Sequence, residues 1–410
     1  MLNQSFDEKT LLKLTTKKEI INFKLGRSES DYVSKLSQIS KTINNESFNF
    51  HSISNFTYKN KVVYRTNSPE EFYALRKITD NIKRIYKVKF SNKDEIVSQV
   101  INILSDTSSY NIIRLDVKDF FESINFHSLL IKLETDNILS NASLNHLKKL
   151  KKLLPPDFDG LPRGLSISSV LSELFMEDID EKIRSTPGIY FYARYVDDII
   201  IISHNKNHNI DHFRKIFITK SLDLNKKSSH LEILSINTDS EASNFTFLGY
   251  TYHIHHSINE CGDRKLSIDM SSKKIKKIKS RVISTILSFS KDSNYTLLTN
   301  RIKFLSGNYI VKIDTNYKQF FSNDDSGALK GGIYYNNKFI TTNKSLSEIN
   351  IFIKKLLFCK KNNAVGKAVR SIPINIRRSL LSHCFIVGHN RIVIHDFDAS
   401  EIKKIKQCWY

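Results

Sequence analysis

The sequence is poor in residues that interrupt regular structure and in residues that cross-link it. Among 410 residues there are 12 Gly, 6 Pro and 4 Cys. The cysteines form no Cys-x-x-Cys pair, so neither a zinc knuckle nor a disulfide framework is indicated. We therefore expect reduced thiols, as in a cytoplasm. Apolar runs such as Ile199–Ile202 are far too short to span a membrane, and the polar start MLNQSFDEKT is unlike a signal peptide.

Positive charge is what the sequence has in excess. Lys and Arg number 63 against 42 Asp and Glu, which gives a net charge of +21. A polyanion is the natural partner of such a chain, because neutralised phosphates release counterions and this release favours binding. Nucleic acid is therefore the first candidate. A generally basic surface without a partner is the alternative, since net charge bears on association and not on fold.

The hydrophobic pattern predicts a mixture of helices and strands. The length favours two or three packed subdomains, and the shortage of Gly and Pro indicates long regular elements. Helical spacing covers residues 93–104, 118–133, 143–154, 168–183, 209–222, 273–290 and 400–409. Strand patterns cover residues 111–117, 190–195, 199–203, 245–258 and 329–335. Because two of these strands flank a tight polar turn, we predict an α+β fold built on an antiparallel hairpin.

Three carboxylates lie at positions where removing a charge from water is costly. Asp116 ends an apolar strand, and Asp197 and Asp198 form the tip of the hairpin. A divalent cation would compensate them, since magnesium prefers oxygen ligands and bridges carboxylates to phosphates. Two such ions stabilise both the attacking and the leaving oxygen of a phosphoryl transfer. Taken singly, each aspartate is more commonly explained as an ordinary turn or strand-end residue.

An ordered series of motifs resembles the reverse transcriptases. Tyr195-Val-Asp-Asp198 resembles their YxDD box, and Leu115-Asp-Val-Lys-Asp-Phe-Phe121 resembles their first aspartate motif. Residues 160–172, with Leu161-Pro-Arg-Gly164, resemble the LPxGxxxS segment. Asn225-Lys-Lys-Ser228 resembles the Asn-x-Lys-Thr element, and Phe247-Leu-Gly249 resembles the primer grip. The resemblance covers about residues 70–255.

The resemblance implies a role for each matching residue. Asp116, Asp197, Asp198 and the carbonyl of Val117 would hold two Mg²⁺ ions, for which Mn²⁺ could substitute. Lys227 would reach the leaving phosphates, and the alternative is that it is one more surface lysine of a basic chain. Phe121, Arg163 and Gly164 would line the nucleotide site, with Phe121 excluding a 2′-hydroxyl or, alternatively, serving as a core aromatic. Residues 72–84 resemble the basic fingers hairpin, so Lys77 and Arg84 would clamp the triphosphate unless they form a solvated basic face. Phe247, Leu248 and Gly249 would grip the primer.

The same resemblance implies a right-hand polymerase. We expect the N-terminal region and fingers in residues 1–105 and the palm with inserted fingers helices in 106–258. A helical thumb would occupy 259–345, with the basic helix at residues 271–281 along a duplex. A small C-terminal extension would occupy 346–410. The activity implied is RNA-directed DNA synthesis from dNTPs on an RNA template. The expected setting is anti-phage defence with a noncoding RNA, and with a companion protein or oligomer in some relatives.

Departures from the family pattern keep alternatives open. Arg163 stands where many relatives carry Gln, and Ser169 where they carry Pro. Template-independent or protein-primed DNA synthesis by the same site therefore remains open. A silent maturase-like RNA-binding protein is disfavoured by the three intact aspartates, and an RNA polymerase by Phe121. A true retron enzyme is disfavoured because Asn141–His146 resembles the Asn-Ala-x-x-His element with its His one residue late, and no Val-Thr-Gly is found near the thumb.

Two further features have no assigned role in this resemblance. His253, His255, His256 and Cys261 lie close together in sequence. We expect polar strand positions there, with metal or nucleic-acid contact as the minor alternative. The final helix, with Ser400 as its expected cap and the only Trp, Trp409, would close the thumb or bind RNA or a partner chain.

Overall fold

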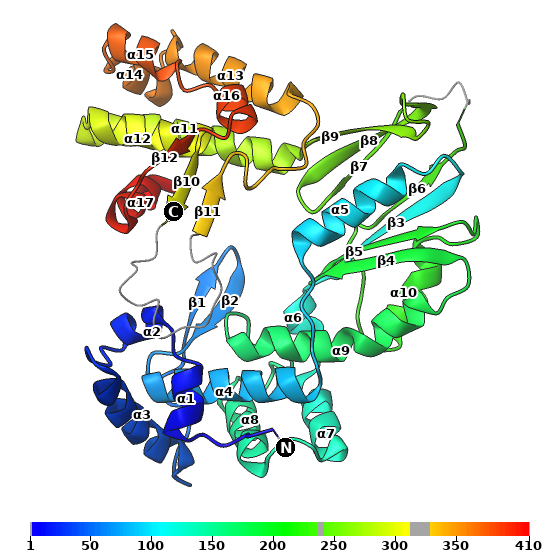
Figure 1. Cartoon of the computed structure of the whole chain (residues 1–410), viewed down its shortest axis with the longest axis vertical. Coiled ribbons are helices and arrows are strands. Elements are labelled where there is room, and N and C mark those ends of the chain that lie inside the picture. The colour runs from blue at the N-terminus through cyan, green and yellow to red at the C-terminus, as the bar shows by residue number, and fades with distance from the viewer. Residues whose placement is uncertain (1, 237–241, 312–328, 410) are drawn as a thin grey trace. The chain divides into compact units, whose positions relative to one another are not determined.

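The computed structural model describes residues 2–236, 242–311 and 329–409. The chain divides into two units. Unit 1 comprises residues 1–96 and 109–233, and unit 2 comprises residues 97–108 and 234–410. Figure 1 labels the helices and strands of each unit.

Unit 1 contains a four-stranded antiparallel sheet with the order β4-β5-β3-β6. Its strands are β3 Tyr110–Asp116, β4 Ile189–Tyr195, β5 Asp198–Ser203 and β6 Ser229–Ile233. The four consecutive isoleucines of β5 are all completely buried, so both faces of this strand are covered. β-branched residues suit such a position because they pack well on a pleated surface. β5 therefore forms the rigid centre on which the neighbouring strand ends are aligned.

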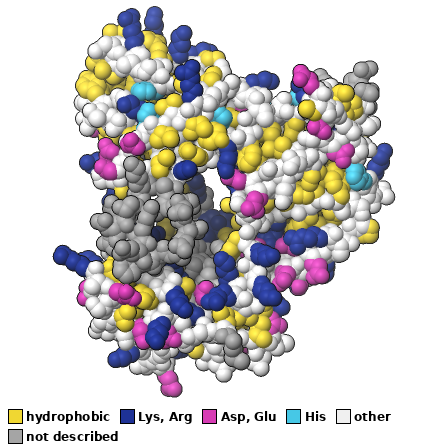
Figure 2. Space-filling view, in the orientation of Figure 1, with side chains coloured by type: hydrophobic (Ala, Val, Ile, Leu, Met, Phe, Trp, Pro, Cys, Tyr) yellow, Lys and Arg dark blue, Asp and Glu magenta, His cyan; other side chains and the backbone are white. Residues whose placement is uncertain are grey.

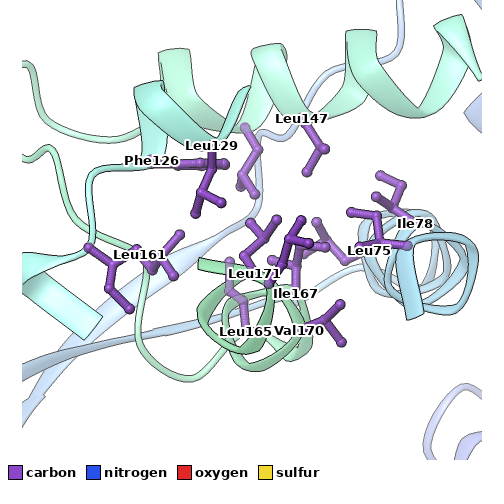
Figure 3. Packing of buried hydrophobic residues seen from close by; sticks show 14 of the residues in the cluster. Leu75, Ile78, Phe126, Leu129, Leu147, Leu161, Leu165, Ile167, Val170 and Leu171 are labelled. Carbon is purple, nitrogen blue, oxygen red and sulfur yellow. The ribbon is translucent and has the colours of Figure 1, made fainter. Parts of the chain in front are cut away.

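Helices and a hairpin complete unit 1. They are α1 Glu8–Lys13, α2 Lys17–Asn22, α3 Glu29–Asn44, β1 Ser54–Tyr58, β2 Lys61–Arg65, α4 Pro69–Ile85, α6 Phe120–Ser123, α7 Phe126–Asp136, α8 Asn141–Leu153, α9 Ser166–Arg184 and α10 Ile210–Ile218. Figure 3 shows apolar side chains of α4, α7, α8 and α9, such as Leu75, Leu129, Leu147 and Leu171, meeting in one core. This core holds the helices that carry the loops of the candidate site.

The prediction of a hairpin over residues 72–84 is wrong. Residues 69–85 form one helix, α4, which begins at the cap Ser68 with Pro69 in the first turn and acidic residues behind it. These are strong helix-start signals. The hairpin of unit 1 lies earlier, where β1 and β2 pair in antiparallel register, in a region whose sequence pattern is weak.

Most other predicted elements are confirmed, with three corrections. The helix expected over 118–133 is broken into α6 and α7. The strand expected over 245–258 is two strands, β7 Ser243–Phe247 and β8 Tyr250–Ile258, joined by a turn. The last helix, α17 Ala399–Lys406, is capped by the carboxylate of Asp398 and not by Ser400. The predicted α+β class is confirmed.

Unit 2 combines a second sheet with a helical core. Its other elements are β9 Arg264–Met270, α11 Ser272–Asp292, α12 Tyr295–Ser306, β10 Asn308–Val311, β11 Leu329–Gly332, α13 Lys344–Leu357, α14 Ala364–Arg370, α15 Ile374–Leu380, α16 Phe385–Asn390, β12 Ile394–His395 and the 3₁₀ turn Gln407–Trp409. Helix α5 Lys93–Leu104 runs from one unit into the other. Strands β7, β8 and β9 form an antiparallel sheet, and β10 pairs with β11 and β12. The core of the helices includes Val282, Leu346 and Val369.

The indole of Trp409 fastens the end of the chain to α11. Its Nε1 donates to the Arg281 carbonyl at 3.0 Å and to the Thr285 hydroxyl at 3.1 Å. The last segment is thus part of the helical core of unit 2. Among the helices of the described residues, none combines the length and the apolar character that crossing a membrane requires.

Candidate active site

Strand register brings the three aspartates to one end of the sheet. Asp116, the last residue of β3, lies opposite Asp198, the first residue of β5. Tyr195 closes the β4–β5 hairpin opposite Asp198, so only Val196 and Asp197 form its turn. The Val117 amide donates to the Asp197 carbonyl at 3.2 Å. Backbone pairing across three strands therefore places Asp116, Asp197 and Asp198 together, independently of their side-chain rotamers.

The turn itself has an unusual backbone. Val196 has φ +60°, a left-handed conformation that a β-branched residue rarely adopts. Such conformations cost about 1–3 kcal/mol and persist only where the surroundings impose them. Arg194 supplies one such restraint, since its Nη1 donates to the Val196 carbonyl at 3.2 Å.

Arg194 is the centre of a buried ionic network behind the turn. It makes paired hydrogen bonds to Asp180 at 2.9 and 2.7 Å and to Glu173 at 3.1 and 2.7 Å. Tyr192 donates its hydroxyl to Asp180 at 2.6 Å. Burial alone would lower the pKa of Arg194, but the two carboxylates raise it above the usual value. The network ties helix α9, which carries both acids, to the strand that leads into the turn.

The three aspartates place negative charges close together, an arrangement that a bound cation would stabilise. Burial raises the pKa of the Asp197 carboxyl, and the nearby Asp198 and Asp116 carboxylates raise it further. Asp198 Oδ1 lies 3.3 Å from Arg114 Nη2, so one carboxylate is paired with a guanidinium two residues before Asp116. In the described parts of the chain, no three His, Cys, Asp or Glu side chains converge as a ready-made metal centre. The donor set of three carboxylates nevertheless fits hard, oxygen-preferring divalent ions.

The loop that carries Lys227 is attached to the backbone of Asp116. The Asn225 amide donates to the Asp116 carbonyl at 2.7 Å, and the Asp116 amide donates to the Ser228 hydroxyl at 3.2 Å. Val117 also forms a bridge with Leu224. Lys227 is exposed on this loop. Its backbone is therefore anchored beside the aspartates, while its side chain extends from the surface there.

Phe121 and Arg163 contact one another. The Arg163 guanidinium lies 5.1 Å from the Phe121 ring centroid. It also forms two hydrogen bonds of 3.1 Å with Glu122. The Leu161 amide donates to the Phe121 carbonyl at 2.8 Å, so the loop before α9 runs along Phe121. Arg163 is thus held by the last ring of the first aspartate motif and by the carboxylate of the residue that follows it.

Gly164 allows the β1–β2 hairpin to approach that loop. Its φ is +99°, and a Cβ there would lie 2.5 Å from the Tyr64 carbonyl oxygen. The Tyr64 amide donates to the Arg163 carbonyl at 2.7 Å. Lys61 of β2 pairs with Asp119, and this contact lowers the pKa of the Asp119 carboxyl. The hairpin therefore belongs to the same site, which sequence reasoning missed.

Lys77 and Arg84 lie apart from these contacts. Lys77 is only 2% exposed, and its Nζ donates to the Asn3 carbonyl at 3.0 Å and lies 3.7 Å from Asp80. Arg84 is exposed and lies 3.9 Å from the same Asp80. Both are helical residues of α4. Their contacts are structural, and the expected clamp on a triphosphate has no support in this geometry.

The predicted primer grip is a tight turn within unit 2. Leu248 and Gly249 join β7 to β8 with φ values of +46° and +82°, and Phe247 is buried. The Gly249 carbonyl accepts from the Ser271 amide at 3.1 Å. Lys274 Nζ lies 4.2 Å from the centroid of the Tyr250 ring. Contacts with the start of α11 therefore stabilise the turn.

The histidine group at residues 253–256 forms no metal centre among the described residues. His253 and His255 lie on one face of β8, and His255 Nε2 is 3.1 Å from the Ser267 hydroxyl. They are strand positions, as expected. The residues that sequence reasoning missed are Arg114 and Arg194, which were visible as charges inside otherwise apolar strands. A charge at such a position requires a partner.

Two comparisons with known proteins bear on the identity of the chain. A family model described as "Reverse transcriptase (RNA-dependent DNA polymerase)" matches residues 31–252, which is more than half of the chain. Among solved structures, the chain aligns with apo telomerase from Candida tropicalis truncated from its C-terminal domain. That alignment has 12% identity and a TM-score of 0.34, and covers 61% of this chain and 50% of that chain. The chain thus spans about half the length of that structure, and the family assignment rests on the family match.

Proposed function

The chain belongs to the reverse transcriptase (RNA-dependent DNA polymerase) family, and from that premise we propose that it extends a DNA strand on an RNA template. The observation that carries the proposal is the register that sets Asp116 opposite Asp198, with Asp197 in the adjoining turn. Membership of the family fits a right-hand polymerase with mixed helices and antiparallel sheets.

We propose that Asp116, Asp197 and Asp198 hold two Mg²⁺ ions, with the Val117 carbonyl as a further ligand. When bound, the ions would stabilise both oxygens of an in-line phosphoryl transfer. The protein's part is to preorganise the carboxylates, since the sheet aligns them before substrate arrives. The raised pKa of the Asp197 carboxyl supports this reading, because crowded buried carboxylates are relieved by a cation.

The proposal assigns sugar selection to Phe121. Its ring contacts the Arg163 guanidinium at 5.1 Å and the Phe120 ring at 5.3 Å. A fixed ring discriminates by size better than a mobile one, because it cannot move aside for an added hydroxyl. Arg163 is thereby a positioning residue for Phe121, and Gly164 lets the β1–β2 hairpin cover the loop.

Other roles in the proposal rest on the motif resemblance. Lys227 would reach the leaving phosphates from its loop beside Asp116, and Phe247–Gly249 would grip the primer. For the fingers, palm, thumb and C-terminal extension, the proposal adopts residues 1–105, 106–258, 259–345 and 346–410. Lys77 and Arg84 are left out, because their contacts in α4 are structural.

Nucleotide incorporation by the purified full chain, with co-purifying RNA retained, tests the proposal. Labelled dNTPs or NTPs are supplied with Mg²⁺ or Mn²⁺. We expect DNA product from the wild type and none from a variant with Asp197→Asn and Asp198→Asn. The matched control Asp211→Asn, an exposed aspartate of α10, should retain activity. Equal product from the double variant and the wild type contradicts the catalytic assignment.

The same assay separates the alternatives. DNA product that still forms when RNase removes the RNA before dNTPs are added indicates template-independent synthesis. Product covalently attached to protein indicates protein priming. No product under any condition indicates a silent RNA-binding protein.

For the biological setting we propose phage defence in a bacterial cytoplasm with a noncoding RNA and, in addition, a companion protein or oligomer. This rests on the motif resemblance. Loss of plaque reduction in the aspartate double variant is the corresponding test.

A further inference from the structure

A stretch of unit 2 carries positive charge without any acidic residue. Residues 349–395 contain five lysines and four arginines, and no Asp or Glu. The stretch lies wholly outside the region matched by the family model. Figure 2 shows Lys and Arg side chains gathered over α13, α14 and α15 at the top of the view. Since nothing acidic within the stretch neutralises these charges, they favour a polyanionic ligand.

Part of this charge lines a cavity. The cavity, of about 470 Å³, is lined by Phe358, Cys359, Lys360, Asn362, Arg370 and Arg377. The segment that follows α13 supplies Phe358, Cys359, Lys360 and Asn362, and α14 and α15 supply Arg370 and Arg377. Its volume is within the range of small-ligand sites. Three cations, Lys360, Arg370 and Arg377, therefore line one surface hollow.

The two arginines are held in place by neutral acceptors. Arg370 donates to the Lys361 carbonyl at 3.1 Å and to Asn362 Oδ1 at 3.4 Å. Arg377 donates to the Leu357 carbonyl at 3.4 Å, and its Nε is buried with no hydrogen-bond partner among the described residues. No ion pair joins either arginine to a carboxylate within the described ranges. Because each guanidinium has five N–H donors, both retain capacity for an anion.

An aromatic ring accompanies the cations. Phe358 is 38% exposed, and the Arg377 guanidinium lies 6.0 Å from its ring centroid. Exposed aromatic rings beside cations are typical of sites for single-stranded nucleic acid, in which a base stacks and a phosphate is paired. A free phosphate would use the cations alone, whereas a nucleotide in a strand would also use the ring.

We propose that this cavity binds a nucleotide of single-stranded nucleic acid. The phosphate lies among Lys360, Arg370 and Arg377, and the base stacks on Phe358. The site tethers a strand outside the catalytic unit. The inference rests on the proposed function only in taking nucleic acid as the ligand. It requires neither metal nor dNTP, so its failure and that of the polymerase proposal are distinguishable.

Cys359 provides a local probe of the cavity. The full chain in EDTA, without dNTPs, is alkylated with iodoacetamide in the presence and absence of an unstructured 20-mer RNA. Mass spectrometry then follows each cysteine. We expect the RNA to slow alkylation of Cys359 at least fivefold and to leave exposed Cys261 unchanged as an internal control. An unchanged rate at Cys359 would overturn the proposal.

Charge-matched variants complete the test. Arg370→Gln with Arg377→Gln should abolish protection of Cys359 and weaken RNA binding, measured by fluorescence anisotropy, at least tenfold. Lys354→Gln with Lys355→Gln removes equal charge from exposed positions of α13 and should weaken binding less than threefold. If both double variants lost equal RNA affinity, binding would depend on the overall positive charge and not on this site, and the proposal would be refuted. Because arginine loss could disturb folding, the exposed Lys360→Glu serves as a second variant and should also abolish protection.

The choice of competitor identifies the ligand chemistry. Single-stranded RNA and DNA should both protect Cys359, and the stronger of the two identifies the natural strand. Inorganic polyphosphate should protect less well, because it cannot stack on the ring. Equal protection by polyphosphate, or an unchanged affinity in Phe358→Leu, would overturn the stacking contact.

Discussion

The buried network of Arg194 allows one prediction to be worked through. The side chains of Arg194, Glu173 and Asp180 are 5%, 12% and 10% exposed. Arg194→Met removes the cation and leaves two nearly buried carboxylates together. Loss of one partner from a buried ion pair costs about 3–5 kcal/mol, because an unpaired charge stays buried. We expect the free energy of unfolding of unit 1 to fall by about that amount.

Urea unfolding followed by circular dichroism measures this loss. With an m value of about 3 kcal/mol/M, the midpoint should fall by roughly 1–2 M. Incorporation activity measured well below the midpoint should also fall, because the Val196 carbonyl loses its donor beside the catalytic turn.

The control is a neutral triple variant, Arg194→Met with Glu173→Gln and Asp180→Asn. It removes all three charges, and replacing a buried ion cluster by neutral groups is often tolerated. We expect most of the lost stability to return. A midpoint shift below 0.3 M for Arg194→Met (about 1 kcal/mol), or a triple variant no more stable than the single one, would refute the reasoning about buried charge.

Three further predictions concern the site and its support. Phe121→Ala should raise the kcat/KM for NTPs relative to dNTPs about tenfold, or ~1.4 kcal/mol, and an unchanged ratio would exclude Phe121 as the sugar gate. Arg114→Met should strengthen Mn²⁺ binding about fivefold, because an ion pair worth ~1 kcal/mol no longer competes with the metal for Asp198. Electron paramagnetic resonance measures the bound Mn²⁺. Weaker binding would show that Arg114 instead positions the carboxylate. Burial lowers the pKa of His146 to about 4. The unfolded state, with a His pKa near 6.5, therefore takes up the proton first as pH falls, and stability present above pH 6.5 is lost toward pH 4. Urea midpoints should show wild type ~2 kcal/mol less stable at pH 5 than at pH 7 from this source, and His146→Phe should lose less; equal losses in both proteins would contradict the assignment to His146.

Local sequence patterns were sufficient to predict the strands and the turn that contain the aspartates. The isoleucines of β5 and the polar turn before them predict a hairpin because alternation and turn chemistry act over a few residues. The same local rules misplaced the basic hairpin. Residues 72–84 were compared with the fingers hairpin on the basis of their charges. The N-cap Ser68 and Pro69 in the first turn instead start a helix there.

The pairing of side chains far apart in sequence was not predictable. Lys77 was expected to bind phosphate, but it is buried and its Nζ donates to the Asn3 carbonyl, 74 residues away. Arg163 was noted as a departure, and its partner Glu122 lies 41 residues earlier. No periodic pattern encodes such contacts, because they depend on how separate elements pack.

By itself, then, the sequence determined the α+β class and the order of the motifs, as well as the three aspartates, because each rests on short-range periodicity or on a motif. Only the tertiary structure decided which cation meets which anion. It pairs Asp198 with Arg114, holds Arg163 on Phe121, and surrounds one hollow of unit 2 with Arg370 and Arg377. The physical reason is that electrostatic and packing contacts depend on distance in space, which a linear pattern does not contain.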